Sequence, residues 1–110
     1  MLTPIPKSVM PSSVAVRVPV EGDYGGEYGE PQTITGVRFE SAASLVRSDH
    51  VLSDGAKGLL FIDAVNSLGA FEVPVGSLLS IDGQEYAAAG KVDRYECFNG
   101  TVHHWEIEVV

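Results

Sequence analysis

Residues 101–110 have the sequence TVHHWEIEVV, which indicates the secondary structure of the C-terminal end. Its apolar side chains recur at every second position, which is the period of a β-strand with one buried face. One face of such a strand carries His103, Trp105, Ile107 and Val109, and the other carries His104, Glu106 and Glu108. We expect the face with Trp105 to lie in a hydrophobic core. The opposite face, with His104, Glu106 and Glu108, is the candidate subunit-contact strand.

Two turn signals organise the chain before this strand. Asn99-Gly100 leads directly into it, and Asp82-Gly83 lies between the segments 77–81 and 85–95. Both dipeptides are typical of two-residue hairpins, because Asn, Asp and Gly accept the positive φ that primed turns need. The C-terminal half is therefore predicted to form antiparallel strands at these two segments and at the final stretch.

The N-terminal half contains three further strand patterns. Valines alternate with other residues over 14–20, where Pro19 indicates that part of the strand lies at a sheet edge. Residues 32–40 give a second strand, in which Gly36 interrupts the alternation and predicts a bulge. The continuous apolar run 59–65 suits a strand that is covered on both faces.

These patterns place the chain in the all-β class, as a small antiparallel β-barrel or sandwich. We expect a single domain over residues 1–110, with an extended Pro-rich arm at 1–11 and an acidic, glycine-rich loop or hairpin tip at 21–31. A long inter-strand loop is predicted at 41–58, and its first residues are compatible with a short helix. Loops of that length tend to carry function.

Composition argues against several classes of function. The 110-residue chain has 15 acidic and 7 basic residues and a formal net charge of −8, which repels phosphate backbones and disfavours tight nucleic-acid binding. An acidic wall is still compatible with a passage along which DNA slides without adhering. Cys97 is the single cysteine, so an intrachain disulfide and a cysteine-rich zinc site are excluded, and a reducing compartment is compatible with the chain.

Targeting and membrane signals are missing from the sequence. Residues 1–7 lack the continuous apolar stretch of a signal peptide, and no run of apolar residues approaches membrane-spanning length. We therefore expect a soluble protein that stays in the cell that makes it.

No constellation in the sequence predicts catalysis. His103 and His104 are neighbours on a strand, so they should point to opposite sides and fail to serve one metal ion. Nothing around Cys97 indicates an activated thiol. The acidic segment 21–30 lacks the alternating ligand spacing of a calcium loop, and no phosphate-binding glycine motif is present. We expect no enzymatic activity, no catalytic residue, no cofactor and no metal site.

Four stretches carry a more specific resemblance. They are Ile5-Pro6-Lys7, the block LFIDAVNS at 60–67, the hairpin IDGQEY at 81–86 and the closing HHWEIEVV at 103–110. In this order, and over nearly the whole chain, they resemble the minor capsid proteins of tailed bacteriophages and prophages. The resemblance points to the head-completion, or head-to-tail stopper, proteins.

This resemblance implies a structural role in the virion. It implies a homo-oligomeric ring in the neck, which joins the portal and adaptor ring to tail-completion or tail-terminator proteins. It further implies assembly in the host cytoplasm, transient non-specific proximity to packaged DNA, and no contact with a membrane. No cofactor and no catalytic residue are implied.

The resemblance also indicates a candidate channel loop. In stopper proteins a long inter-strand loop points into the channel and helps to retain packaged DNA, and by position the segment 41–57 corresponds to it. The candidate channel residues are Ser41, Leu45, Val46, Arg47, Asp49, His50, Asp54 and Lys57. Two alternatives stay open, namely a β adaptor module unrelated to phages and a component of the tail tube or tail terminator.

Overall fold

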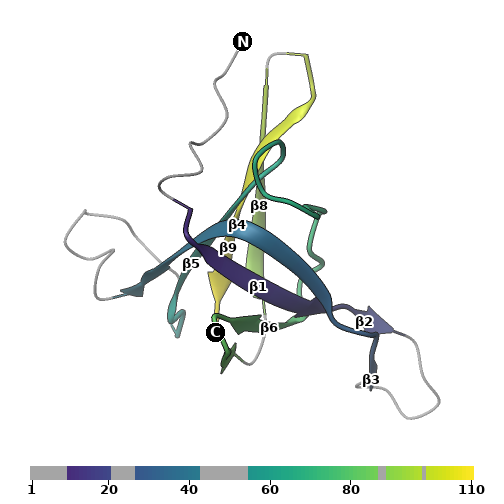
Figure 1. Cartoon of the computed structure of the whole chain (residues 1–110), viewed down its shortest axis with the longest axis vertical. Helices are drawn as coiled ribbons and strands as arrows, with labels where there is room; N and C mark the ends of the chain where they lie inside the picture. Colours follow the sequence, from purple (N-terminus) through teal and green to yellow (C-terminus); the bar gives the residue numbers. More distant parts are fainter. Residues whose placement is uncertain (1–9, 21–26, 43–54, 87–88, 98) are drawn as a thin grey trace.

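A computed structural model describes residues 10–20, 27–42, 55–86, 89–97 and 99–110 of the chain. Its strands are β1 (Ser12–Arg17), β2 (Pro19–Val20), β3 (Glu27–Tyr28), β4 (Gln32–Ser41), β5 (Gly58–Asp63), β6 (Leu78–Ile81), β7 (Gln84–Tyr86), β8 (Ala89–Glu96) and β9 (Val102–Val109) (Figure 1). Apart from Ala42, which has helical geometry, every regular element within these ranges is a strand. The predicted all-β class is confirmed.

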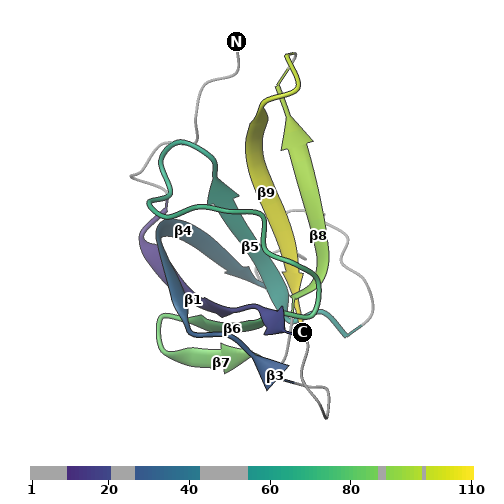
Figure 2. The same cartoon turned by 90° about the vertical axis from the view of Figure 1, so that its right-hand side faces the viewer.

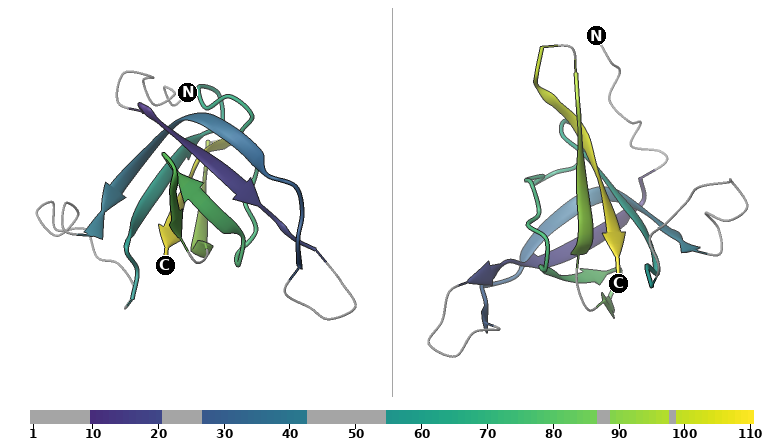
Figure 3. Two further views of the ribbon diagram at one scale, coloured as in Figure 1. Left: turned by 60° about the horizontal axis from the view of Figure 1, so that its bottom comes forward. Right: turned by 180° about the vertical axis from the view of Figure 1, so that it is seen from behind.

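Seven of these strands form one antiparallel sheet in the order β7-β6-β1-β4-β5-β9-β8, and β2 pairs with β3 in a separate small hairpin. The large sheet is curled into a half-barrel, as Figures 2 and 3 show. Gly36 in β4 contributes to this shape. Ser12 lies opposite Val37 while Ser13 lies opposite Thr35, so Gly36 is the extra residue of a bulge. Such a bulge bends its strand, which confirms the prediction made from the sequence.

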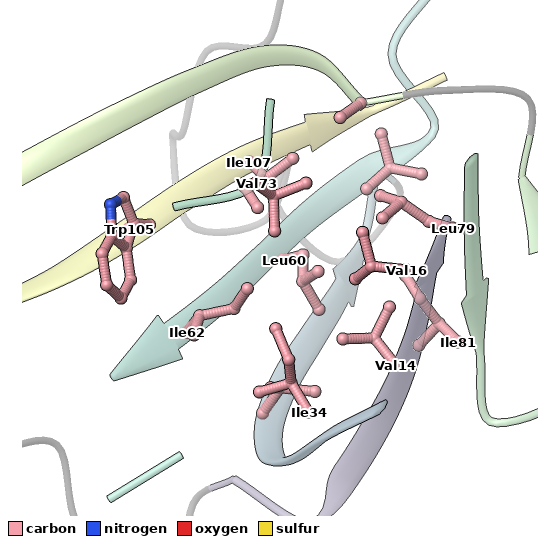
Figure 4. Close-up of a cluster of buried hydrophobic side chains, with 13 residues drawn as sticks. Val14, Val16, Ile34, Leu60, Ile62, Val73, Leu79, Ile81, Trp105 and Ile107 are labelled. Atoms are coloured by element: carbon pink, nitrogen blue, oxygen red, sulfur yellow. The ribbon is translucent and has the colours of Figure 1, made fainter. Parts of the chain in front are cut away.

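The hydrophobic core lies on the inner side of the curl (Figure 4). It is built from alternate residues of the strands, as a period of two requires. Its members are Val14, Val16, Ile34, Val37, Leu60, Ile62, Leu79, Ile81, Ala89, Trp105, Ile107 and Val109, together with Val73 from the connection before β6. The expected burial of the Trp105 face of the last strand is therefore confirmed.

Strand β5 lies in the middle of the sheet and is covered on both sides. It pairs with β4 through Leu60 and Phe39 and with β9 through Leu60 and Ile107. Five of its six residues are buried, the exception being the half-buried Phe61. The apolar run at 59–65 is thus a doubly covered strand as predicted, although the strand ends at Asp63.

The predicted strand at 85–95 is wrong, because two strands occupy this stretch. The Asp82-Gly83 turn is confirmed, since Ile81 lies opposite Gln84 and both turn residues have positive φ, 49° and 87°. After this turn, β7 and β8 lie at opposite edges of the sheet. The backbone of Ala89 instead bonds to the segment before β6, with Ala89 N donating to Ser77 O at 2.9 Å and Gly76 N donating to Ala89 O at 2.8 Å. These bonds join the edge strand β8 to the segment before β6 at one end of the half-barrel.

The turn at Asn99-Gly100 is also longer than predicted. Glu96 pairs with Val102, so five residues connect β8 to β9. Gly100 N donates to Cys97 O at 3.0 Å, and Cys97 N donates to Thr101 O at 2.7 Å. Gly100 has a φ of 82°, whereas Asn99 does not have the positive φ of a primed turn. The turn position was predicted correctly and its type was not.

Both edge strands of the sheet are irregular. β7 has only three residues. β8 is interrupted by two register shifts, between Ala89 and Lys91 and between Tyr95 and Glu96. Its charged side chains pair along the strand, with Lys91 Nζ 3.6 Å from an Asp93 carboxylate oxygen and Arg94 Nε 3.1 Å from a Glu96 oxygen.

Candidate assembly surfaces

The candidate subunit-contact strand is β9, which lies inside the sheet between β5 and β8. Its backbone is therefore already paired on both sides, and only its side chains can contact a partner. His104 and Glu106 have side chains 17% and 15% exposed, and Glu108 is buried. The structure thus leaves little of this face accessible in the single subunit. Its role in subunit contacts stays a prediction.

His104 lies at the centre of a compact group of polar rings and carboxylates. Its ring stacks on Tyr95 of the neighbouring strand, with centroids 4.6 Å apart and planes inclined by 2°. Its Nε2 lies 2.9 Å from Glu106 Oε2, and its Nδ1 lies 2.7 Å from His103 Nδ1. One of the two histidine rings must donate and the other must accept in this last contact.

The contact between His103 and His104 corrects the expectation that neighbouring rings point apart. The register shift between Tyr95 and Glu96 leaves His103 without an opposite residue on β8, because Tyr95 faces His104 and Glu96 faces Val102. A bulge of this kind breaks the alternation of side-chain directions. Even so, the His, Cys, Asp and Glu side chains of the described ranges form no group of three or more that could hold a metal ion.

Tyr95 is affected by the carboxylate on the next strand. The negative charge of Glu106 raises the pKa of the Tyr95 phenol above its ordinary value of 10.0, and desolvation and Asp93 act in the same direction. Lys91 opposes them. Because a nearby negative charge disfavours the phenolate, Tyr95 stays a neutral hydrogen-bonding group near neutral pH.

The candidate channel loop is firmly held at its base. Ser41 pairs with Gly58, Ala42 N donates to Lys57 O at 2.9 Å, and Lys57 N donates to Val109 O at 2.6 Å. Gly58 is required there, because a Cβ at this position would lie 2.5 Å from Glu40 O and from the Phe39 ring. Of the candidate channel residues, Ser41 and Lys57 are exposed. The others, Leu45, Val46, Arg47, Asp49, His50 and Asp54, lie outside the described residues.

A turn that the sequence analysis did not single out follows β5. We call residues 64–69 the β5 tip. Asp63, which is fully buried, accepts hydrogen bonds at Oδ2 from Val65 N at 2.9 Å and Asn66 N at 2.7 Å. Ser67 Oγ donates to Gly36 O at 2.6 Å, and Leu68 exchanges two backbone hydrogen bonds with Thr35. The β5 tip is thereby fixed to β4, while Val65 and Leu68 are 71% and 76% exposed.

A groove lies between β8 and the connection that leads to β6. We call it the β8 groove; its lining residues are Glu72, Val73, Pro74, Val75, Val92 and Arg94. One end is held by the backbone bonds of Ala89 described above. At the other end Arg94 Nη1 lies 3.3 Å from Glu72 Oε1, which also accepts a hydrogen bond from Trp105 Nε1 at 3.1 Å. Sequence reasoning missed Glu72, because no local pattern connects it with Arg94 or Trp105.

Comparison with known families adds the identity of the chain. The profile of the minor capsid protein family matches residues 7–109, which is nearly the whole chain. The chain belongs to the minor capsid protein family. Membership makes it a phage structural protein and a component of the virion. No curated protein and no solved structure matches it.

The family match bears on the earlier expectations for this minor capsid protein. The resemblance drawn from LFIDAVNS and HHWEIEVV is confirmed at the level of the family. Cys97 is a free, half-buried thiol. Within the described residues, no helix is both long and apolar enough to cross a membrane.

Proposed function

We propose that this minor capsid protein forms a homo-oligomeric ring in the neck of the virion. The ring joins the portal and adaptor ring to tail-completion or tail-terminator proteins, and it helps to retain packaged DNA. Family membership supports a virion role, and the small all-β subunit suits a contact repeated many times around an axis.

The clamped base of the candidate channel loop carries this proposal. Strands β4 and β5 remain paired up to Ser41 and Gly58, and Lys57 is additionally bonded to Val109 of β9. Three strands of the sheet therefore hold the two ends of the segment 42–57. A loop that starts from a rigid scaffold is the usual way in which a protein presents a functional segment at a defined place.

The charge of the chain is consistent with this position. DNA passes through the neck during packaging and ejection, so a wall that bound phosphates would slow it. With 15 acidic and 7 basic residues the subunit is repelled by the DNA backbone. The expected proximity to DNA is therefore transient and non-specific, and retention would come from obstruction of the channel.

The first test locates the protein and removes the loop. Antibody labelling of purified virions in the electron microscope should place the protein at the junction of head and tail. Labelling along the tail would instead favour a tail-tube component. Replacing residues 43–54 by a short Gly-Ser linker should give heads that fill with DNA and then lose it.

A matched control shortens a different connection. Residues 21–26, between β2 and β3, are removed in the same way, and these virions should keep their DNA. Retention is measured as nuclease-resistant DNA per particle over time. Normal retention in the 43–54 variant would remove the channel role and leave the joining role to be judged by the labelling.

A further inference from the structure

The β5 tip is a rigid turn that exposes two aliphatic side chains. Val65 and Leu68 are 71% and 76% exposed, although the backbone beneath them is held by the buried carboxylate of Asp63 and by the paired Leu68 and Thr35. A flexible loop could fold such side chains against its own surface, whereas this one is held outward. Exposed apolar groups on a rigid support lose little entropy when they bind a partner, so they favour a protein contact.

The segment that contains the β5 tip has few ionisable side chains in a strongly acidic chain. From residue 64 to residue 81 the only ionisable side chain is Glu72, and Glu72 is paired with Arg94. Two copies of a subunit with a net charge of −8 repel each other over most of their surface. Contact between copies is therefore least opposed where both surfaces lack uncompensated charge.

The β8 groove is the second surface with this character. Val73 is buried in the core beneath it, Val75 is 62% exposed, and Val92 is half-buried on the opposite wall. Its two charged residues, Glu72 and Arg94, pair with each other, and Arg94 also pairs with Glu96. The groove thus offers a mainly aliphatic surface that can receive aliphatic side chains without leaving a charge unpaired.

The two surfaces lie on different sides of the subunit. In Figure 2 the β5 tip is at the left, and the chain then crosses the open side of the half-barrel to reach the base of β8 at the right. One subunit can therefore use its β5 tip on a neighbour while a second neighbour uses its β8 groove. Contacts between two different patches of identical chains are heterologous. They generate a closed ring when the rotation from each copy to the next adds up to a full turn.

We infer that Val65 and Leu68 of the β5 tip dock into the β8 groove of the next copy of this chain. The inference rests on the proposed ring, to which it assigns the contact between subunits. The contact is apolar and small, so it becomes stable only when it is repeated around the ring.

Cross-linking in purified virions tests this contact. In a Cys97→Ser background, the double variant Val65→Cys/Val75→Cys is treated with a short bis-maleimide. It should give a ladder of covalent dimers and larger species, since each β5 tip then lies beside the β8 groove of a neighbour. The matched control is Val20→Cys/Val75→Cys, in which Val20 is also an exposed valine, at 46%, but lies on β2. The control should give only monomer.

Substitution supplies a second readout. Leu68→Glu should lower incorporation into virions about tenfold or more, because a carboxylate would have to enter the aliphatic groove. Val20→Glu should have little effect on incorporation. The melting temperature of both purified variants should match that of the parent, since both side chains project into solvent.

The outcomes distinguish a failure of the proposed docking contact from a failure of the proposed ring. If the protein labels the neck in several copies but the 65/75 pair gives no more ladder than the 20/75 pair, the docking of the β5 tip is wrong and the ring stands. If the protein is not in the neck, or is present there as a single copy, the proposed function fails and the inference fails with it.

Discussion

Asp63 and Ser67 are joined by two hydrogen bonds across the turn that follows β5. Asp63 N donates to Ser67 Oγ at 2.9 Å, and Ser67 N donates to Asp63 O at 3.2 Å. Ser67 Oγ in turn donates to Gly36 O, so one hydroxyl links the turn to the bulge of β4. A buried polar group that is bonded in this way fixes a local conformation, and its loss leaves other buried groups unpaired.

Ser67→Ala should therefore destabilise the fold. We expect a loss of about 1–3 kcal/mol in the free energy of unfolding, because Asp63 N and Gly36 O lose their shared partner. Urea denaturation of the purified protein measures it. Ser80→Ala, on the half-buried outer side of β6, is the comparison and should change the free energy by less than about 0.5 kcal/mol. Equal losses in the two variants would contradict the linking role of Ser67.

Gly58→Ala should disrupt the base of the candidate channel loop. The new Cβ would lie 2.5 Å from Glu40 O, a distance that requires the backbone to move. We expect a loss of about 2 kcal/mol or more in the free energy of unfolding. Gly29→Ala is the matched control, because its nearest contacts would be ordinary ones at 3.6 and 3.7 Å. A Gly58→Ala protein as stable as the control would show that strands β4 and β5 tolerate a wider spacing there.

Glu72→Ala should change the environment of Trp105, the single tryptophan of the chain. The indole Nε1 loses its acceptor and Arg94 loses one of its two carboxylate partners. Tryptophan fluorescence should shift, and the free energy of unfolding should fall by about 1 kcal/mol. Glu85→Ala removes an exposed carboxylate on β7 and should leave both quantities unchanged. Unchanged fluorescence in Glu72→Ala would mean that Glu72 does not contact the indole in solution.

The raised pKa of Tyr95 predicts a loss of folding stability in alkaline solution. Its pKa is raised in the folded protein by Glu106, so between pH 10 and the folded pKa the unfolded chain releases this proton while the folded chain keeps it. Stability therefore falls as the pH rises through this window. Tyr95→Phe should reduce the fall. Glu106→Gln should bring the phenol pKa back toward 10.0, as measured by ultraviolet titration, and an unchanged pKa in that variant would reject Glu106 as the main cause.

Those parts of the fold that depend on neighbouring residues were predictable from the sequence. The Asp82-Gly83 turn, the Gly36 bulge and the alternation of the last strand each follow from the chemistry of a few consecutive residues. The division of the stretch 85–95 into β7 and β8 was not predictable in this way. It depends on the pairing of Ala89 with Ser77 and Gly76, which only the curl of the sheet brings together.

In the candidate surfaces too, features set by consecutive residues were predictable and features set by distant contacts were not. The strand at β9 was predicted from its alternation, whereas the limited exposure of His104, Glu106 and Glu108 depends on packing across the sheet, and their role as a contact face stays a prediction. The ordered turn of the β5 tip could not be predicted from the sequence, because Asp63 resembles an ordinary polar residue at the end of an apolar run. Its role becomes visible only through Ser67 and Gly36, which are 31 positions apart. The spacing Asp63 to Ser67 followed by Gly69 was the one local signal for a tight turn.

The irregular edges of the sheet affect how a free subunit can associate with other copies of the chain. A long flat strand at an edge would recruit identical strands from other copies and build fibres. Here β7 is too short, and the kinks and paired charges of β8 interrupt any such template. These edges therefore protect the free subunit from open-ended polymerisation through strand pairing.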